Sequence, residues 1–211
     1  MDSNKEDYVK SRQKTLLASL LLSLWAPLTT GIAMSMNNSA TQVADFIRRT
    51  MELFVLLLSW LVFRYLTQNE ELTEDVKKKW EKIVNASVAV VLGASGLIML
   101  SLALFRTKDS GPRGNVSLGL IIAILGFAVN FCFWQRYSIL VSKDYSLIID
   151  AQRQLYLAKV FVDICVIFAL GAIALMPTCI VTRYIDILGS IAVSLYLLWS
   201  AYRTWNIESR T

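Results

Sequence analysis

The sequence predicts an all-α, polytopic membrane protein with six transmembrane helices, and composition is the first reason. Hydrophobic residues make up 55% of the chain and charged residues only 18%, with a mean hydropathy of +0.52. Length is the second reason, because a helix needs roughly 20 mostly apolar residues to cross a bilayer. The chain supplies such stretches at residues 15–36, 43–65, 83–105, 116–140, 155–176 and 180–201. Little sequence remains for a soluble domain.

The first half of the chain is predicted to hold a basic tail and three of these helices. Residues 1–14 are polar and basic and form the tail. The stretch 15–36 is too long, and followed by too many other spans, to be a cleaved signal peptide, so we expect a transmembrane helix. Before the third span, Thr73 is a candidate N-cap, followed by acidic residues and then lysines. This order matches the helix dipole and predicts a helical lead into 83–105.

Turn signals separate the remaining spans. Residues 107–115 contain the run Asp-Ser-Gly-Pro-Arg-Gly, which predicts an external loop before 116–140. Pro177 separates the fifth span from the sixth by a short link. Residues 206–211 then form a short C-terminal tail, and we expect residues 15–205 to form one transmembrane domain.

Lysine and arginine outside the spans predict the orientation. With the N-terminus inside, the cytoplasmic segments hold Lys5, Lys10, Arg12, Lys14, Arg64, Lys77, Lys78, Lys79, Lys82, Arg136, Lys143, Arg153, Arg203 and Arg210. The other side holds Arg106, Lys108, Arg113 and Arg183. We therefore expect an integral protein of the cell membrane with both termini in the cytoplasm. This placement also explains the net charge of +5 without a nucleic-acid partner.

The residue inventory argues against an enzyme. The chain has no histidine, which removes the commonest transition-metal ligand and the usual proton switch near neutral pH. Its three cysteines show no pairing pattern, and there is no nucleophile elbow and no phosphate-binding glycine loop. We expect no catalytic residues and no cofactor.

Charged residues inside two of the spans are the strongest functional signal, because a charge within a membrane is costly and usually functional. The second span carries Asp45, Arg48, Arg49 and Glu52, spaced so that all four share one helical face. The fifth span carries Lys159 and Asp163, which extend a polar stripe that begins at Gln152 and Tyr156. Asn130 in the fourth span either hydrogen-bonds a neighbouring helix or reaches a polar pathway. The small residues Gly93, Ala94, Ser95 and Gly96 indicate close helix packing in the third span.

The whole pattern resembles the cation diffusion facilitator family. The resemblance rests on six spans, on Ser39, Ala44 and Asp45 leading into the second, on Asn130 followed by an aromatic and basic exit from the fourth, and on Ser146, Asp150 and Ala151 opening the fifth. It implies a six-helix secondary transporter that exports divalent metal ions in exchange for protons. The family holds its metal between helices two and five, through a His-or-Asp-x-x-x-Asp pair from each.

Carrying these ligand positions over gives an altered site. With Ala44 and Asp45 as the anchor, the helix-two ligands fall on Arg48 and Glu52, of which only Glu52 can bind a metal. With Asp150 and Ala151 as the anchor, the helix-five ligands fall on Arg153 and Leu157, and neither is a ligand. The polar stripe of the fifth span lies roughly opposite these two residues, so either that helix is rotated relative to the family or the stripe serves another interface. The soluble C-terminal domain usual in the family is not in this chain.

Three roles for the intramembrane charges stay open at this point. They form a structural ion-pair network, or a switch in which a substrate cation or proton competes with Lys159 or Arg48 for a carboxylate, or an anion site built on the arginines. We favour proton-coupled export of a cation, divalent metal expected, by a homodimer in the bilayer. The expected pathway residues are Asp45, Glu52, Asp163 and Asp150, with Glu52 as the metal ligand, and the expected internal counter-charges are Arg48, Arg49, Arg153 and Lys159.

The alternative is a scaffold or regulatory protein of the same fold that transports nothing and whose ion site has become internal salt bridges. A cavity that reaches Glu52 favours transport, whereas a dry and fully paired cluster favours the scaffold.

Overall fold

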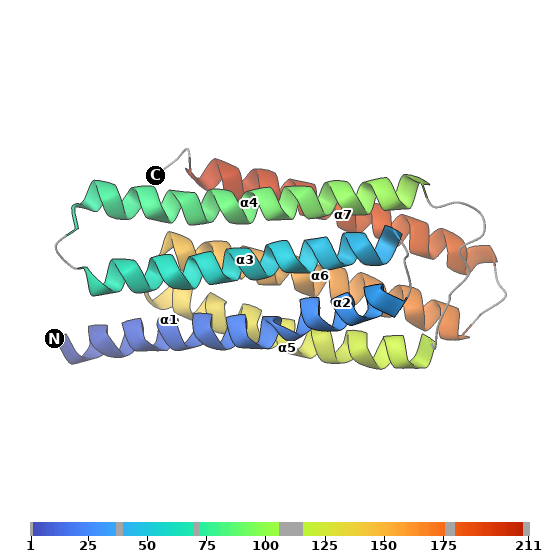
Figure 1. The fold of residues 1–211 in the computed structure, drawn as a ribbon, viewed down its shortest axis with the longest axis horizontal. Helices are drawn as coiled ribbons and strands as arrows, with labels where there is room; N and C mark the ends of the chain where they lie inside the picture. The colour runs from blue at the N-terminus through green and yellow to red at the C-terminus, as the bar shows by residue number, and fades with distance from the viewer. Residues whose placement is uncertain (1, 37–39, 70–71, 106–115, 176–179, 209–211) are drawn as a thin grey trace.

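The computed structural model describes residues 2–36, 40–69, 72–105, 116–175 and 180–208, and these residues form helices without any strand. The helices are α1 (Asp2–Ser23), α2 (Trp25–Met36), α3 (Ala40–Gln68), α4 (Glu74–Phe105), α5 (Val116–Lys143), α6 (Leu147–Leu175) and α7 (Ile180–Glu208). Figure 1 shows them running along the long axis of one bundle, with both chain termini at the same end. The prediction of an all-α membrane bundle is confirmed.

The first predicted span is divided into two helices. α1 and α2 lie end to end (Figure 1) and meet at Leu24, whose N–H still donates to the Leu20 carbonyl at 3.1 Å. Pro27 explains the break, because a proline has no N–H to donate to the carbonyl four residues earlier, here that of Ser23, and its ring crowds that carbonyl. The sequence predicts one helix over residues 15–36, and the structure corrects this to two helices that meet at Leu24. The basic segment before the span is helical too, since α1 begins at Asp2.

The second, third, fourth and sixth predicted spans each lie within a helix, and so does the fifth up to Leu175, after which residues 176–179 are outside the described part of the chain. α4 begins directly after Thr73, where the capping signal placed it. α6 begins at Leu147, eight residues before the predicted fifth span at 155. Among the described residues, three segments are long and apolar enough to cross a membrane by themselves: Glu74–Ser101, Leu120–Lys143 and Leu147–Ala172.

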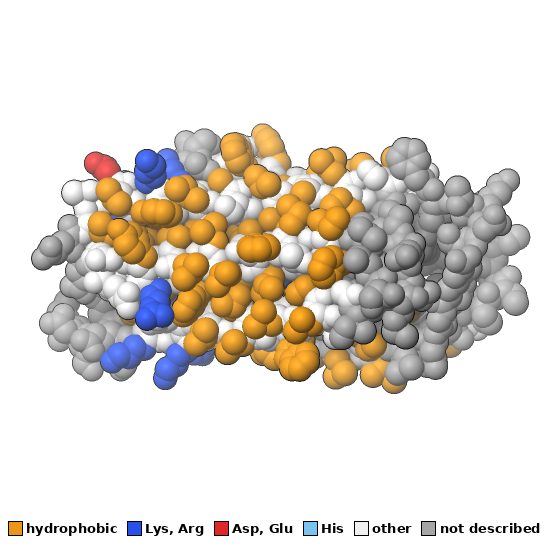
Figure 2. All heavy atoms as spheres, in the orientation of Figure 1, with side chains coloured by type: hydrophobic (Ala, Val, Ile, Leu, Met, Phe, Trp, Pro, Cys, Tyr) orange, Lys and Arg blue, Asp and Glu red, His pale blue; other side chains and the backbone are white. Residues whose placement is uncertain are grey.

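The surface fits a membrane setting. Figure 2 shows hydrophobic side chains over the middle of one face, with lysine and arginine gathered toward the end that holds the N-terminus. Large apolar side chains such as Phe168, Leu175 and Leu104 are well exposed, as expected for residues that face lipid. The apolar band on this face thus has a basic edge toward the end that holds the N-terminus.

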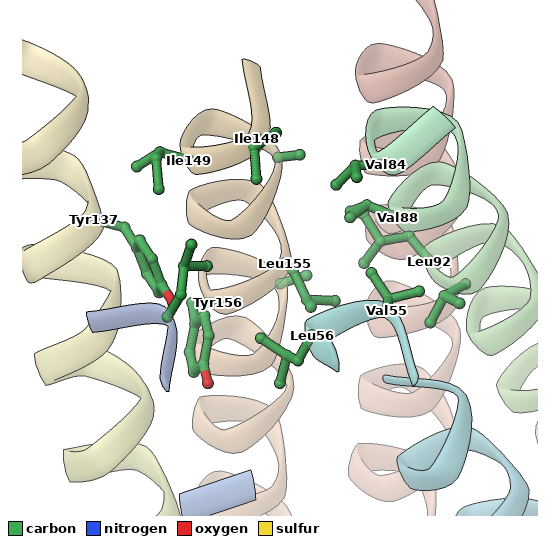
Figure 3. Close-up of a cluster of buried hydrophobic side chains, with 14 of the residues drawn as sticks. Val55, Leu56, Val84, Val88, Leu92, Tyr137, Ile148, Ile149, Leu155 and Tyr156 are labelled. Carbon is green, nitrogen blue, oxygen red and sulfur yellow. The ribbon is translucent and has the colours of Figure 1, made fainter. Parts of the chain in front are cut away.

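The bundle is organised around α6. α5 packs along α6, α4 packs along α7, and α6 also contacts α3, α4 and α7. Its buried side chains meet those of α3, α4 and α5 in a continuous core, where Tyr137 and Tyr156 lie beside each other with ring centres 5.4 Å apart (Figure 3).

Close packing of α4 against α7 confirms the interpretation of the small residues. A Cβ atom on Gly96 would lie 3.0 Å from Leu198 Cγ and 3.1 Å from the Ser194 carbonyl oxygen. A Cβ on Gly171, by contrast, would meet nothing within 4 Å. Gly96 is therefore needed for the two helices to approach, and Gly171 is not.

Gly96→Ala should destabilise the bundle, and Gly171→Ala is the matched control. Overpacking at Gly96 against a backbone oxygen should cost about 1 to 3 kcal/mol. The same change at Gly171 should be neutral or gain up to about 1 kcal/mol from helix propensity. Thermal unfolding of the purified variants in detergent measures both. Equal midpoint temperatures for the two variants would contradict the packing assigned to Gly96.

Candidate functional site

A cavity of about 400 Å³ lies between α1 and α2, α3, α5 and α6. It is lined by Leu22, Ser23, Trp25, Ala26, Thr29, Arg48, Arg49, Glu52, Leu53, Ile122, Leu125, Gly126, Val129, Asn130, Phe133, Tyr156, Lys159, Val162 and Asp163. Five charged side chains thus reach one cavity from two helices, α3 and α6. The cavity lies where the resemblance places the transport site, between the second and fifth spans.

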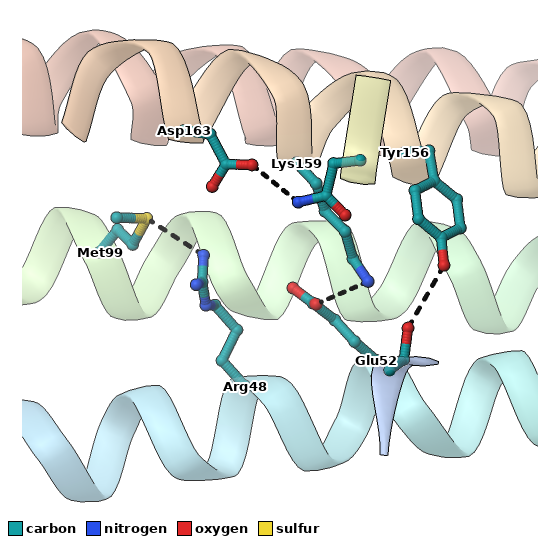
Figure 4. Close-up of polar contacts among 8 residues, drawn as sticks. Arg48, Glu52, Met99, Tyr156, Lys159 and Asp163 are labelled. Atoms are coloured by element: carbon teal, nitrogen blue, oxygen red, sulfur yellow. Dashed lines mark hydrogen bonds and ion pairs between the residues drawn. The ribbon is translucent and has the colours of Figure 1, made fainter. Parts of the chain in front are cut away.

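Glu52 and Lys159 form an ion pair across the cavity. Lys159 Nζ lies 3.1 Å from Glu52 Oε2, and each side chain is only 14% exposed. The same ammonium lies over the ring of Tyr156, 4.8 Å from its centre, and the Tyr156 hydroxyl is within 3.3 Å of Ser23 Oγ. Figure 4 shows Lys159 extending from α6 toward the Glu52 carboxylate on α3. Lys159 thus lies between a carboxylate and an aromatic face.

Asp163, one turn further along α6, has a different partner. Asn130 Nδ2 on α5 donates a 2.7 Å hydrogen bond to Asp163 Oδ2, and Asn130 also lines the cavity, so both roles considered for it are present. A Cβ atom on Gly126 would lie 4.0 Å from this same oxygen, so the absence of a side chain there leaves room beside the carboxylate. Asp163 is held in place by a neutral donor and faces the cavity.

Arg48 and Arg49 complete the charged lining. The Arg48 guanidinium lies 4.0 Å from the Met99 sulfur on α4, and both arginines are partly buried. Among the described residues the lining therefore carries three cationic and two anionic side chains, a net positive charge of one. Asp45 lies on α3, but its side chain is outside the described residues.

The remaining predicted residues lie elsewhere. Asp150 and Arg153 form their own ion pair of 2.5 Å near the start of α6, where the Asp150 side chain is 6% exposed, and neither lines the cavity. Leu157 does not line it either. The polar stripe, by contrast, faces inward, and Gln152 Nε2 donates to Ser59 Oγ on α3 at 2.6 Å. Lys159 and Asp163 are thus the charged residues of α6 at the cavity, whereas Arg153 and Leu157, the positions that the resemblance gives, lie outside its lining.

The sequence alone did not predict several of the residues that line the cavity. Trp25 and Ser23 flank the break between α1 and α2, and Phe133 projects from α5. An aromatic or hydroxyl residue in an apolar helix gives no signal of the direction in which it points. Pro27 was the usable signal, since it implies irregular backbone next to these residues.

A metal centre in the usual sense does not fit the described residues. No group of three or more His, Cys, Asp or Glu residues that could hold a metal ion is found among them. Zinc sites generally need three or four such ligands. Glu52 as a metal ligand therefore stays a prediction, with Asp163 as the other carboxylate of the cavity.

Comparison with known proteins gives the family. The sequence model of the cation efflux transmembrane domain matches residues 16–206. None of the curated proteins matches the chain. The family match spans most of the sequence, so the expected resemblance to the cation diffusion facilitators is confirmed, and the protein belongs to the cation efflux family of membrane transporters.

Proposed function

We propose that the protein is a proton-coupled secondary transporter that exports a cation from the cytoplasm through the cavity between α3 and α6. The observation that carries the proposal is the Glu52–Lys159 pair, whose side chains are only 14% exposed and yet border a cavity of about 400 Å³. A cation that enters this cavity meets a carboxylate whose present partner is a tethered ammonium. Family membership supports cation transport in general.

The cavity favours transport over the scaffold alternative. Replacing a buried ion pair by packed apolar residues is often neutral or stabilising, so a protein that needs only assembly gains little from the pair. A scaffold would also be expected to fill the space beside Glu52 with side chains, because protein interiors are close-packed. Space next to a charged pair is instead what an exchangeable ligand requires.

The chemistry of exchange follows from the two carboxylates on one face. A substrate cation that binds Glu52 displaces Lys159, and Asp163 lies one helical turn away from Lys159 and within its reach. The displaced ammonium thereby keeps a counter-charge, which avoids the cost of an unpaired charge in a low dielectric. Without substrate, Lys159 returns to Glu52 and neutralises the empty site.

Protons and the two sides of the membrane complete the proposal. A proton on Glu52 or Asp163 competes with a cation for the same carboxylate, so the two can be exchanged across a membrane with a proton gradient. Rocking of the helices around the cavity would expose it to either side in turn, with a homodimer as the assembled form. A divalent metal ion is the substrate that the family implies, and it would take Glu52 as its carboxylate ligand while Asp163 holds the displaced Lys159.

Glu52→Gln should abolish cation flux driven by a proton gradient. The variant keeps the size of the side chain and removes the charge that attracts the substrate. Purified protein in proteoliposomes is screened with zinc, manganese, cobalt, cadmium, magnesium and sodium. Glu74→Gln, the same change at an exposed position outside the cavity, is the control and should leave flux unchanged. Folded wild-type protein that moves none of these ions and no organic cation would contradict the proposal.

Lys159→Ala should uncouple cation movement from protons. Without the tethered ammonium, Glu52 has no internal partner, so the substrate cation should bind more tightly and leave more slowly. We expect substrate affinity to rise about tenfold or more, since loss of a competing ion pair is worth above 1.4 kcal/mol. Flux and internal pH are recorded together in the same proteoliposomes. Unchanged coupling in this variant would show that Lys159 has no part in exchange.

A further inference from the structure

Lys159 shows what kind of group the cavity accommodates. Its ammonium has the Glu52 carboxylate at 3.1 Å and the Tyr156 ring at 4.8 Å. A carboxylate together with an aromatic face is a common recognition set for organic ammonium groups. The chain thus places a primary alkylammonium in its own site, at the end of a flexible side chain.

The volume and walls of the cavity fit an organic molecule better than a bare ion. Small-molecule sites in proteins usually enclose about 300 to 1,000 Å³, and this cavity of about 400 Å³ falls within that range. Much of its lining is apolar or aromatic, including Trp25, Leu53, Ile122, Val129 and Phe133. Such walls offer favourable burial to the carbon atoms of a ligand and no coordinating atoms to a metal ion.

The acidic groups of the lining favour a monovalent ligand. A divalent ion loses more hydration on entering, and the described residues offer it no group of three acidic, cysteine or histidine ligands. An organic ammonium needs only one carboxylate and spreads its charge near an aromatic face.

From these observations we infer that the transported cation is a monovalent organic ammonium ion that takes the place of the Lys159 ammonium on Glu52. The inference rests on the proposed function and gives the chemical class of its substrate. The ammonium binds between Glu52 and Tyr156, and its carbon part lies along the apolar wall formed by α2 and α5. Asp163 receives the displaced Lys159.

Binding tests the inference on the full-length protein in detergent. n-Butylammonium chloride reproduces the Lys159 head group, n-butanol is the neutral control of the same size, and zinc chloride is the metal comparison. Isothermal titration should detect n-butylammonium but not n-butanol. Glu52→Gln should weaken n-butylammonium binding about tenfold or more, because a buried charge pair is lost. Asp75→Asn, at the start of α4 and outside the cavity, is the control and should bind n-butylammonium as the wild type does.

A second variant, Trp25→Ala, keeps the inference testable if Glu52→Gln fails to fold. Trp25→Ala shortens the apolar wall without touching an ion pair, and it should weaken n-butylammonium binding while leaving any zinc binding unchanged. Equal affinity of wild type and Trp25→Ala for n-butylammonium would overturn the assigned pose.

A transport assay distinguishes failure of this inference from failure of the proposed cation transport on which it rests. Choline is the probe, since its permanent charge prevents it from crossing the bilayer as a neutral amine. Uptake of choline into proteoliposomes under a proton gradient, lost in Glu52→Gln, is the expected result. Flux of zinc or manganese without choline would overturn the ammonium assignment and leave cation transport standing. Flux of neither would overturn both.

Discussion

The ion pair between Glu52 and Lys159 is the interaction on which the interior of this bundle depends. A charged side chain within a bilayer costs several kcal/mol unless it is partnered. α3 and α6 each bring a charge to the same depth, and the 3.1 Å pair between them neutralises both. The two helices are also joined by the 2.6 Å hydrogen bond from Gln152 to Ser59. The contact between these helices is therefore polar at the site and apolar in the core.

The cavity exists because three features leave space beside this pair. Pro27 divides the first span, so α2 does not continue the line of α1 past the charges. Gly126 has no side chain beside Asp163, and Asn130 holds that carboxylate toward α5. Together these features leave room for a ligand beside a charged pair whose side chains are each only 14% exposed.

The sequence predicts the fold better than the site. The helices follow from runs of apolar residues, and Thr73 predicts the start of α4 correctly. Glu52 and Lys159 could be singled out because charges in a membrane are rare, but their pairing depends on the rotation of α6 relative to α3. That rotation is set by side-chain packing at Gln152, Leu155 and Tyr156, which a single sequence does not reveal.

A double-mutant cycle between Glu52 and Lys159, run with and without a saturating concentration of the transported cation, tests the central claim most directly. The single variants Glu52→Gln and Lys159→Gln and their combination are compared with wild type by unfolding free energy. If the pair is an exchangeable site, a coupling energy of about 0.5 to 3 kcal/mol without cation should fall toward zero with it, because the cation replaces Lys159. The same coupling energy in both conditions would mean that the pair is structural.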